Sequence, residues 1–355
     1  MKNKIEDKKA IKSFKYPNDN FIYNIMLIYF FSKIYYYIYI YIYIYMKTFF
    51  FKKSLEPRLS NFKKIYLEYK NKNKILNFKG GNTKIPKIIY MFWHDTTKMP
   101  FFVRRCMHNI KTKNPDYKVK LYNFNDVMKI KNKPKIFEKY GKNEYIIMEE
   151  YRIIADWLRL YLLKTNGGIW MDISCIFNKK SLNDIVDLNS EKLQGFLPPW
   201  DDSAEIIENW FLAAKKNNLL IEYWFKEWEI ALLNKKEYSK QNLNYATQSL
   251  KPFLPYLTQH LTFLKIIKLN NLQNLFQSLG YANAKNNPFD YHEKFNWKIK
   301  NLCQFLLTTK KLNDDLLFIK LRGSERMLII NSIKKCKFSK NSQIVRDLHI
   351  KCIKT

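Results

Sequence analysis

The feature that most constrains the fold is a long apolar helix that ends at two glycines and leads directly into an apolar strand. Helical periodicity runs from about residue 144 to 165, and residues 153–163 are apolar nearly all round, as in a buried helix. The Asn-Gly-Gly turn at 166–168 suits a left-handed helix cap. Residues 169–177 follow as a nearly continuous apolar run, which is typical of a central strand covered on both faces.

Further elements are predicted before this unit. We expect a buried strand at 85–93, a helix at 100–113, a second strand at 118–124, and short helices around 125–131 and 135–140. An order of strand, helix, strand, helix, strand indicates an α/β domain with a largely parallel sheet. The remainder of the chain predicts a more helical C-terminal part.

Asp156 and Arg159 are the charged pair of the long helix. They are three residues apart and therefore share a face. Because the helix is predicted to be buried, unpaired charges there would cost several kcal/mol. One interpretation is a mutual salt bridge that only orients the helix. The other is a pair that binds a ligand.

Asp172 is the one charge in the strand predicted at 169–177. A carboxylate at the carboxyl end of a central strand lies where open α/β sheets bind ligands. It needs a counter-charge, which either Arg159 or a divalent metal ion supplies. Mg²⁺ and Mn²⁺ prefer oxygen ligands and bridge diphosphates. A purely structural role for this carboxylate is the alternative.

Together these residues form a recognisable motif. Residues 155–174, ADWLRLYLLKTNGGIWMDIS, closely resemble the signature S-D-x-x-R-x-x-x-L-x-x-x-G-G-x-[WY]-x-D-x-[DTS]. That signature belongs to glycosyltransferases of the capsular polysaccharide synthesis group and to the related family 32 sugar transferases with a DXD motif. Residues 85–93 are similar to the first strand of such enzymes, and residues 209–218 are similar to their N-W-F-[IL]-A-A segment.

The resemblance implies a glycosyltransferase with an A-type, Rossmann-like fold that uses a nucleotide-sugar donor and a glycan or lipid-linked acceptor. It implies that Asp156 and Arg159 contact the sugar or ribose hydroxyls and the phosphate. Gly167 and Gly168 would allow close backbone approach to the donor. Relatives of family 32 retain the anomeric configuration, so retention is expected here, in surface or capsular polysaccharide synthesis.

The resemblance also implies a metal site and two further contacts. Asp172 and Ser174 would hold Mn²⁺ or Mg²⁺ on the diphosphate, although Ser174 stands where a strict DXD motif has its second carboxylate. Trp93 would stack on the base, with core packing as the alternative. Asn209, which opens the second matched segment, is expected among the catalytic residues. Ala155 departs from the signature, which has Ser, and an inactive relative is a further alternative.

The chain is strongly basic, with 63 Lys plus Arg against 31 Asp plus Glu and a formal charge of +32. Such a charge attracts polyanions. The excess of Lys, Asn, Ile, Tyr and Phe is also what AT-rich codons produce without any such partner. A basic protein that binds nucleic acid or an anionic membrane surface is the competing class. It does not explain the helix-glycine-strand motif, so nucleic acid is not expected as a partner.

The N-terminal segment is apolar and aromatic, with Lys33 as the only charge between residues 21 and 46. Its length suits a membrane anchor, but its Ile-Tyr alternation also has the period of a strand and is what a translated TATATA repeat produces. We expect residues 1–84 to be this segment with a lysine-rich linker, 85–335 the transferase domain and 336–355 a basic tail. The five scattered cysteines favour a reducing compartment, and a cytoplasmic or membrane-associated location is expected.

Overall fold

The computed structural model describes residues 84–140 and 147–352, so the predicted segment before residue 84 lies outside it. The strands are β1 (Ile88–Phe92), β2 (Lys118–Tyr122), β3 (Gly168–Met171), β4 (Cys175–Phe177), β5 (Leu193–Leu197), β6 (Phe211–Ala214), β7 (Phe276–Tyr281) and β8 (Phe318–Lys320). The α-helices are α2 (Phe101–Lys113), α3 (Phe124–Met128), α4 (Ile147–Asn166), α5 (Leu219–Leu233), α6 (Lys235–Gln241), α7 (Thr258–Asn270), α8 (Asp290–Lys294), α9 (Ile299–Thr308), α10 (Gly323–Lys334) and α11 (Gln343–Asp347). Short 3-10 helices are η1 (Lys135–Lys139), η2 (Leu182–Asp184), η3 (Leu243–Tyr245), η4 (Lys251–Phe253) and η5 (Gln273–Leu275).

A six-stranded sheet in the order β2-β1-β3-β6-β5-β7 forms the centre of the fold. β1 pairs in parallel with β2 and β3, and β5 pairs in parallel with β7. β6 pairs antiparallel with both of its neighbours, so every other strand of this sheet points the same way. The predicted α/β class with a mostly parallel central sheet is confirmed.

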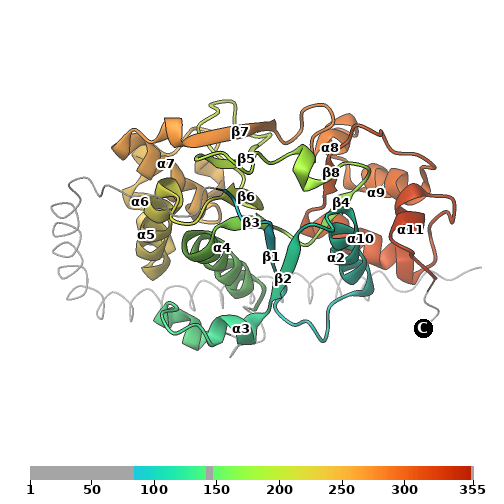
Figure 1. The fold of residues 1–355 in the computed structure, drawn as a ribbon, viewed down its shortest axis with the longest axis horizontal. Coiled ribbons are helices and arrows are strands. Elements are labelled where there is room, and N and C mark those ends of the chain that lie inside the picture. Colours follow the sequence, from blue (N-terminus) through green and yellow to red (C-terminus); the bar gives the residue numbers. More distant parts are fainter. Residues whose placement is uncertain (1–83, 141–146, 353–355) are drawn as a thin grey trace, which may run out of the picture. The chain divides into compact units, whose positions relative to one another are not determined.

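Both faces of the sheet are covered, because its apolar strands alternate their side chains between two cores. Tyr90 and Trp170 contact a cluster that includes residues of α4, α5 and α7, whereas Ile89 and Ile169 contact a cluster that includes Val103 of α2. Figure 1 shows these two groups of helices on opposite sides of the strands. Burial of large apolar side chains on both faces stabilises this three-layer arrangement.

The apolar run at 169–177 is not one strand, and that prediction was wrong. The chain leaves the central sheet after Met171, and residues 175–177 form β4, which pairs antiparallel with β8 in a separate two-stranded sheet. The run carries no turn residue that marks the break. Its cause is the pairing with β8, more than 140 positions further along the chain. Asp172 and Ser174 therefore lie in the bend between two sheets.

A third apolar cluster forms the C-terminal part, which is helical as predicted apart from β8. α9, α10 and α11 pack there against Phe102 and Cys106 of α2. Ile344 and Val345 of α11 are buried in it, although they belong to the stretch predicted as a basic tail. Cys336 and Cys352 form a disulfide in the same region, which the scattered cysteine pattern did not indicate. The domain boundaries stay predictions.

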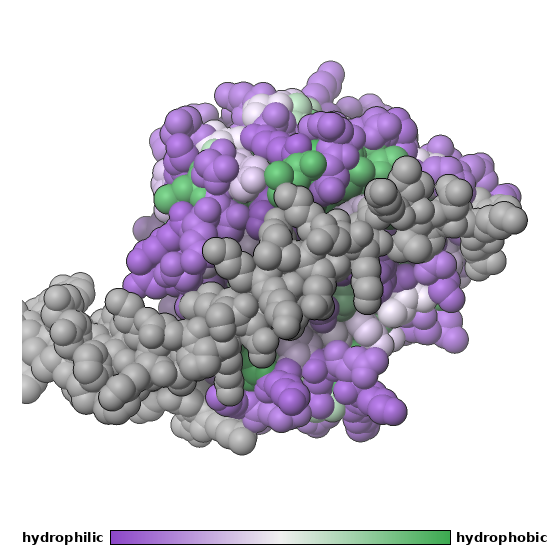
Figure 2. Space-filling model, turned by 90° about the vertical axis from the view of Figure 1, so that its left-hand side faces the viewer, coloured by the Kyte–Doolittle hydropathy of each residue, from purple (hydrophilic) through white to green (hydrophobic). Residues whose placement is uncertain are grey.

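Among the described residues the buried lysines and arginines are Arg159, Lys215, Lys265 and Lys320. On the face shown in Figure 2 the coloured area is mostly hydrophilic, with smaller hydrophobic areas between. None of the helices within residues 84–140 and 147–352 combines the length and the hydropathy that a bilayer crossing requires. The predicted N-terminal anchor falls outside these residues.

Candidate functional site

A pocket of about 190 Å³ lies where β1 and β3 end. This is the edge at which open α/β sheets bind ligands. The pocket combines aromatic rings, three arginines and one carboxylate. Its lining consists of Phe92, Trp93, His94, Tyr151, Arg152, Ala155, Arg159, Trp170, Asp172, Ile173, Ser174 and Arg326.

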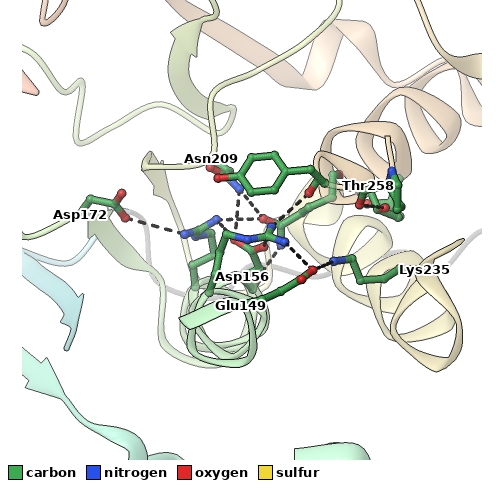
Figure 3. A network of polar contacts seen from close by, with 12 residues as sticks. Glu149, Asp156, Asp172, Asn209, Lys235 and Thr258 are labelled. Atoms are coloured by element: carbon green, nitrogen blue, oxygen red, sulfur yellow. Dashed lines mark hydrogen bonds and ion pairs between the residues drawn. The ribbon is translucent and has the colours of Figure 1, made fainter. Parts of the chain in front are cut away.

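Asp156 and Arg159 form the salt bridge that their spacing predicted, at 2.5 Å between Asp156 Oδ1 and Arg159 Nη1. Both residues are at most 4% exposed. Asn209 Nδ2 donates to Asp156 Oδ1 at 3.3 Å, so the predicted catalytic residues Asp156, Arg159 and Asn209 meet although Asn209 is distant in sequence (Figure 3). Gln259 of α7 accepts hydrogen bonds from Arg159 and Asn209 at 3.0 and 2.8 Å.

Arg159 extends from this network towards the pocket. Its Nη2 lies 3.7 Å from Asp172 Oδ1, and its guanidinium lies over the Trp170 ring at 5.2 Å. Arg159 Nε is buried and has no hydrogen-bond partner among the described residues. A salt bridge that only oriented the helix would not need to leave a buried donor unsatisfied, since such a group costs about 1–3 kcal/mol. Arg159 therefore both pairs with Asp156 within α4 and lines the pocket.

Asp172 has two cationic neighbours. Lys320 Nζ of β8 lies 3.0 Å from Asp172 Oδ2, and Arg159 supplies the second contact. Burial acts to raise the pKa of Asp172, but Lys320 and Arg159 outweigh it and hold the pKa below its ordinary value. The carboxylate is thus ionised and already neutralised by side chains. Its counter-charge includes Arg159, as the sequence suggested, together with a lysine that the sequence did not indicate.

The residues around Asp172 do not fit a divalent metal ion. Ser174 Oγ donates to the carbonyl of Leu321 at 2.8 Å, and it lies 3.4 Å from Lys320 Nζ and 3.5 Å from Arg326 Nη1. A divalent ion about 4 Å from one of these cations would be repelled by about 8 kcal/mol at an effective dielectric constant near 20. Within the described part of the chain no group of three His, Cys, Asp or Glu residues is arranged to hold a metal.

Trp93 follows β1 and is half-buried in the pocket wall. The guanidinium of Arg326 lies 5.3 Å from the centre of its ring, and Trp93 Nε1 has no hydrogen-bond partner in the described residues. His94 stacks on Tyr151 at 4.5 Å between ring centres, and burial lowers the pKa of His94, which favours the neutral ring. Trp93 is thus at the pocket, as base stacking would require, and stacking itself stays a prediction.

Gly167 and Gly168 lie at the other end of β3 from Asp172, where they contact backbone of this chain. Gly167 has φ +66°, and a Cβ there would come within 2.4 Å of the Lys216 nitrogen. Gly168 has φ +114°, and its Cβ would lie 2.9 Å from the Ile88 carbonyl oxygen. The glycines allow α4 to turn into a strand between β1 and β6. They are not among the residues that line the pocket, and the donor contact implied for them stays a prediction.

Four polar residues of the site were not predicted from the sequence. Arg152 contacts Asp156 Oδ2 at 3.3 Å from one turn earlier in α4. Gln259, Lys320 and Arg326 come from segments more than 80 positions after Asp172. Lys320 carried a usable signal, because it is the one charge in the apolar run 316–321, just as Asp172 is in the run 169–177. Gln259 and Arg326 carried none, since each lies in a stretch that mixes polar with apolar residues.

Glu208, which precedes Asn209, should make stability depend on pH. Burial is the main cause that raises its pKa to about 7; Lys320 and Arg159 act to lower the pKa and Asp172 to raise it. Its folded pKa therefore exceeds the ordinary 4.5, so its contribution is complete below about pH 4.5 and is lost as pH rises through 7.

We expect Glu208→Gln to raise the free energy of unfolding by up to about 3 kcal/mol at pH 8 and to have little effect at pH 4.5. Urea denaturation at both pH values measures the difference. Glu138→Gln is the control, because the Glu138 side chain is 64% exposed. Equal effects of Glu208→Gln at the two pH values would contradict the prediction.

Comparison with solved structures finds glycosyltransferases among the chains that this protein resembles. The solved structure of "PaToxG Glycosyltransferase" is 17% identical and covers 69% of this chain and 83% of its own, with a TM-score of 0.32. A glycosyltransferase "involved in the glycosylation of the major capsid of PBCV-1" is 12% identical and covers 69% of this chain and 100% of its own, with a TM-score of 0.36. No curated protein matches the sequence.

The family comparison is more informative. Residues 44–302 match the family described as "Capsular polysaccharide synthesis protein", which is well over half of the 355 residues. The match includes the whole motif at 155–174, the segment at 209–218 and Gln259. The chain therefore belongs to the capsular polysaccharide synthesis protein family, which confirms both the resemblance seen in its sequence and the enzyme class, a glycosyltransferase, that this resemblance implied.

Proposed function

We propose that the protein transfers a sugar from a nucleotide-sugar donor to a hydroxyl group of a glycan or lipid-linked acceptor. The observation that carries this proposal is the pocket at the ends of β1 and β3, where cations and aromatic rings meet beside the Asp156–Arg159–Asn209 network. A nucleotide sugar combines a planar base, hydroxyl groups and a diphosphate. Aromatic rings stack on the base, carboxylates and amides bind the hydroxyl groups, and cations bind the diphosphate.

Each part of the donor has a corresponding group. Trp93 offers a ring face for the base, and the guanidinium of Arg159, which also lines the pocket, is suited to a phosphate or hydroxyl oxygen. Asp156 and Asn209 are joined by a hydrogen bond, and the half-buried Asn209 carries an amide suited to sugar hydroxyls. The ion pairs with Arg152 and Arg159 fix the orientation of the Asp156 carboxylate.

Catalysis in this proposal is mainly electrostatic. The nucleoside diphosphate leaves with increased negative charge on its phosphate oxygens, and fixed cations stabilise that charge as it develops. Binding also holds the acceptor hydroxyl near the anomeric carbon and excludes water, which would otherwise hydrolyse the donor. We propose retention of the anomeric configuration, as the family resemblance implies.

The family assignment supports a role in making surface or capsular polysaccharide. Acceptors of such pathways are glycans or lipid-linked sugars, and the +32 charge of the chain would draw it to an anionic membrane that carries them. A membrane-associated location at the cytoplasmic side is therefore part of the proposal.

A donor screen tests the proposed function. Purified full-length protein would be incubated with UDP-sugars and GDP-sugars, in Mn²⁺, in Mg²⁺ and in EDTA, and nucleoside diphosphate release would be measured. We expect release from one donor above the rate of a protein-free blank. Salt-sensitive binding of nucleic acid or anionic vesicles without any donor binding or turnover would favour the competing class of basic binding protein. Donor binding without release, with every acceptor class supplied, would indicate an inactive relative.

A further inference from the structure

Three side-chain cations meet at the bend between β3 and β4. Lys320 Nζ is 3.0 Å from Asp172 Oδ2, Arg159 Nη2 is 3.7 Å from Asp172 Oδ1, and Arg326 Nη1 is 3.5 Å from Ser174 Oγ. They come from β8, α4 and α10, so tertiary structure brings them together. Asp172 and Ser174 are the two positions at which the family resemblance implies a metal ion.

The fold holds Lys320 at this position. It is 6% exposed, its Nζ also donates to the Leu321 carbonyl at 3.1 Å, and its register in β8 opposite Cys175 is fixed by strand pairing. A buried ammonium costs several kcal/mol unless it is paired. Asp172 is its ion-pair partner among the described residues, and that carboxylate is shared with Arg159.

Arg326 forms no ion pair with the described residues, and the carboxylates of Asp172 and Glu325 act on it from further away. No carboxylate of the described residues lies within 4 Å of its guanidinium, and its neighbours are the Trp93 ring and the Ser174 hydroxyl. It lines the pocket together with Arg152 and Arg159. A guanidinium in that position has several donors directed at the space a ligand would occupy. Its most fitting partner is an anion with several oxygen atoms.

We propose that in this protein Lys320, Arg326 and Arg159 perform the charge neutralisation for which related enzymes use a divalent ion, so that the donor diphosphate binds without metal. This inference rests on the proposed function. Lys320 and Arg326 lie beside Asp172 and Ser174, where an ion would bind, and the Ser174 hydroxyl already donates to a carbonyl. Asp172 then serves as the anchor that orients Lys320 and Arg159.

Titration calorimetry with UDP and GDP tests the inference directly, without any turnover. We expect a Kd in EDTA within about 3-fold of the Kd in Mn²⁺ or Mg²⁺, because the cations are part of the chain. Binding that appears only when Mn²⁺ or Mg²⁺ is present would overturn the inference and leave the proposed function standing. Absence of binding by UDP and GDP under every condition would overturn the proposed function and the inference with it.

Substitutions of single residues test which cations contribute to nucleoside diphosphate binding. Arg326→Met should weaken binding in EDTA by about 10- to 100-fold, which corresponds to the loss of a charge-assisted hydrogen bond. Lys320→Met should weaken it in the same direction, because it leaves the negative charge of Asp172 beside the bound diphosphate without its nearest cation. Lys285→Met removes an equal charge from an exposed position and should leave the Kd unchanged. Lys320→Arg keeps the charge and should bind more tightly than Lys320→Met. If Lys320→Met does not fold, the Kd of Arg326→Met in EDTA is the test. A Kd equal to that of the wild type would then contradict the inference.

Discussion

Asp156→Asn should lower the free energy of unfolding by about 3–5 kcal/mol, because it leaves the buried guanidinium of Arg159 without its closest carboxylate. The nearest remaining carboxylate, that of Asp172, is 3.7 Å from Arg159 and is shared with Lys320. Asparagine keeps the size of the side chain, so the loss would reflect charge rather than a cavity. Urea denaturation followed by circular dichroism measures it.

The matched control for this substitution is Asp116→Asn. Asp116 pairs with Lys87 at 3.3 Å, but both side chains are largely exposed, at 58% and 40%. Exposed pairs contribute about 0–1 kcal/mol, so the control should unfold nearly as the wild type does. A loss for Asp156→Asn as small as that of the control would show that Arg159 does not depend on Asp156, and the central network of the site would have to be revised.

Gly167→Ala should destabilise the protein by about 3–5 kcal/mol or prevent its folding. Its φ of +66° is costly for any residue with a side chain, and the added Cβ would meet backbone atoms of Lys216, Lys215 and Ala214 at 2.4, 2.8 and 3.1 Å. Backbone cannot rotate away as a side chain does. Thermal unfolding of the variant, or its recovery in the soluble fraction, measures the effect.

Gly323→Ala is the control for Gly167→Ala. A Cβ there would meet no atom nearer than 3.9 Å, and its φ is not in the left-handed region, so stability should be unchanged or slightly raised. The folded fraction of Gly167→Ala should still bind nucleoside diphosphate with the wild-type Kd, because Gly167 lies away from the pocket. Intact stability together with lost nucleotide binding would instead return Gly167 to the donor site.

Those features of the site that involve residues close together in the chain could be predicted from the sequence. The three-residue spacing of Asp156 and Arg159 on an apolar helix predicted a buried pair, and the structure contains it. The isolation of Asp172 in an apolar run predicted a carboxylate that needs a counter-charge, and two cations lie beside it. Asn209 entered only through the resemblance to a known family, since no local pattern connects it with Asp156.

The sequence by itself determined the α/β class, the bounds of most elements before residue 170, and the family. These follow from periodicity and from glycines at turns, which are local properties of the chain. Only the tertiary structure decided where the 169–177 run breaks, because the break depends on pairing with β8.

Tertiary structure also decided which charges surround Asp172. Lys320 and Arg326 are distant in sequence, and an electrostatic contact depends on distance in space, not on order along the chain. For the same reason the sequence indicated a metal ion at Asp172 and Ser174, whereas the fold places side-chain cations there.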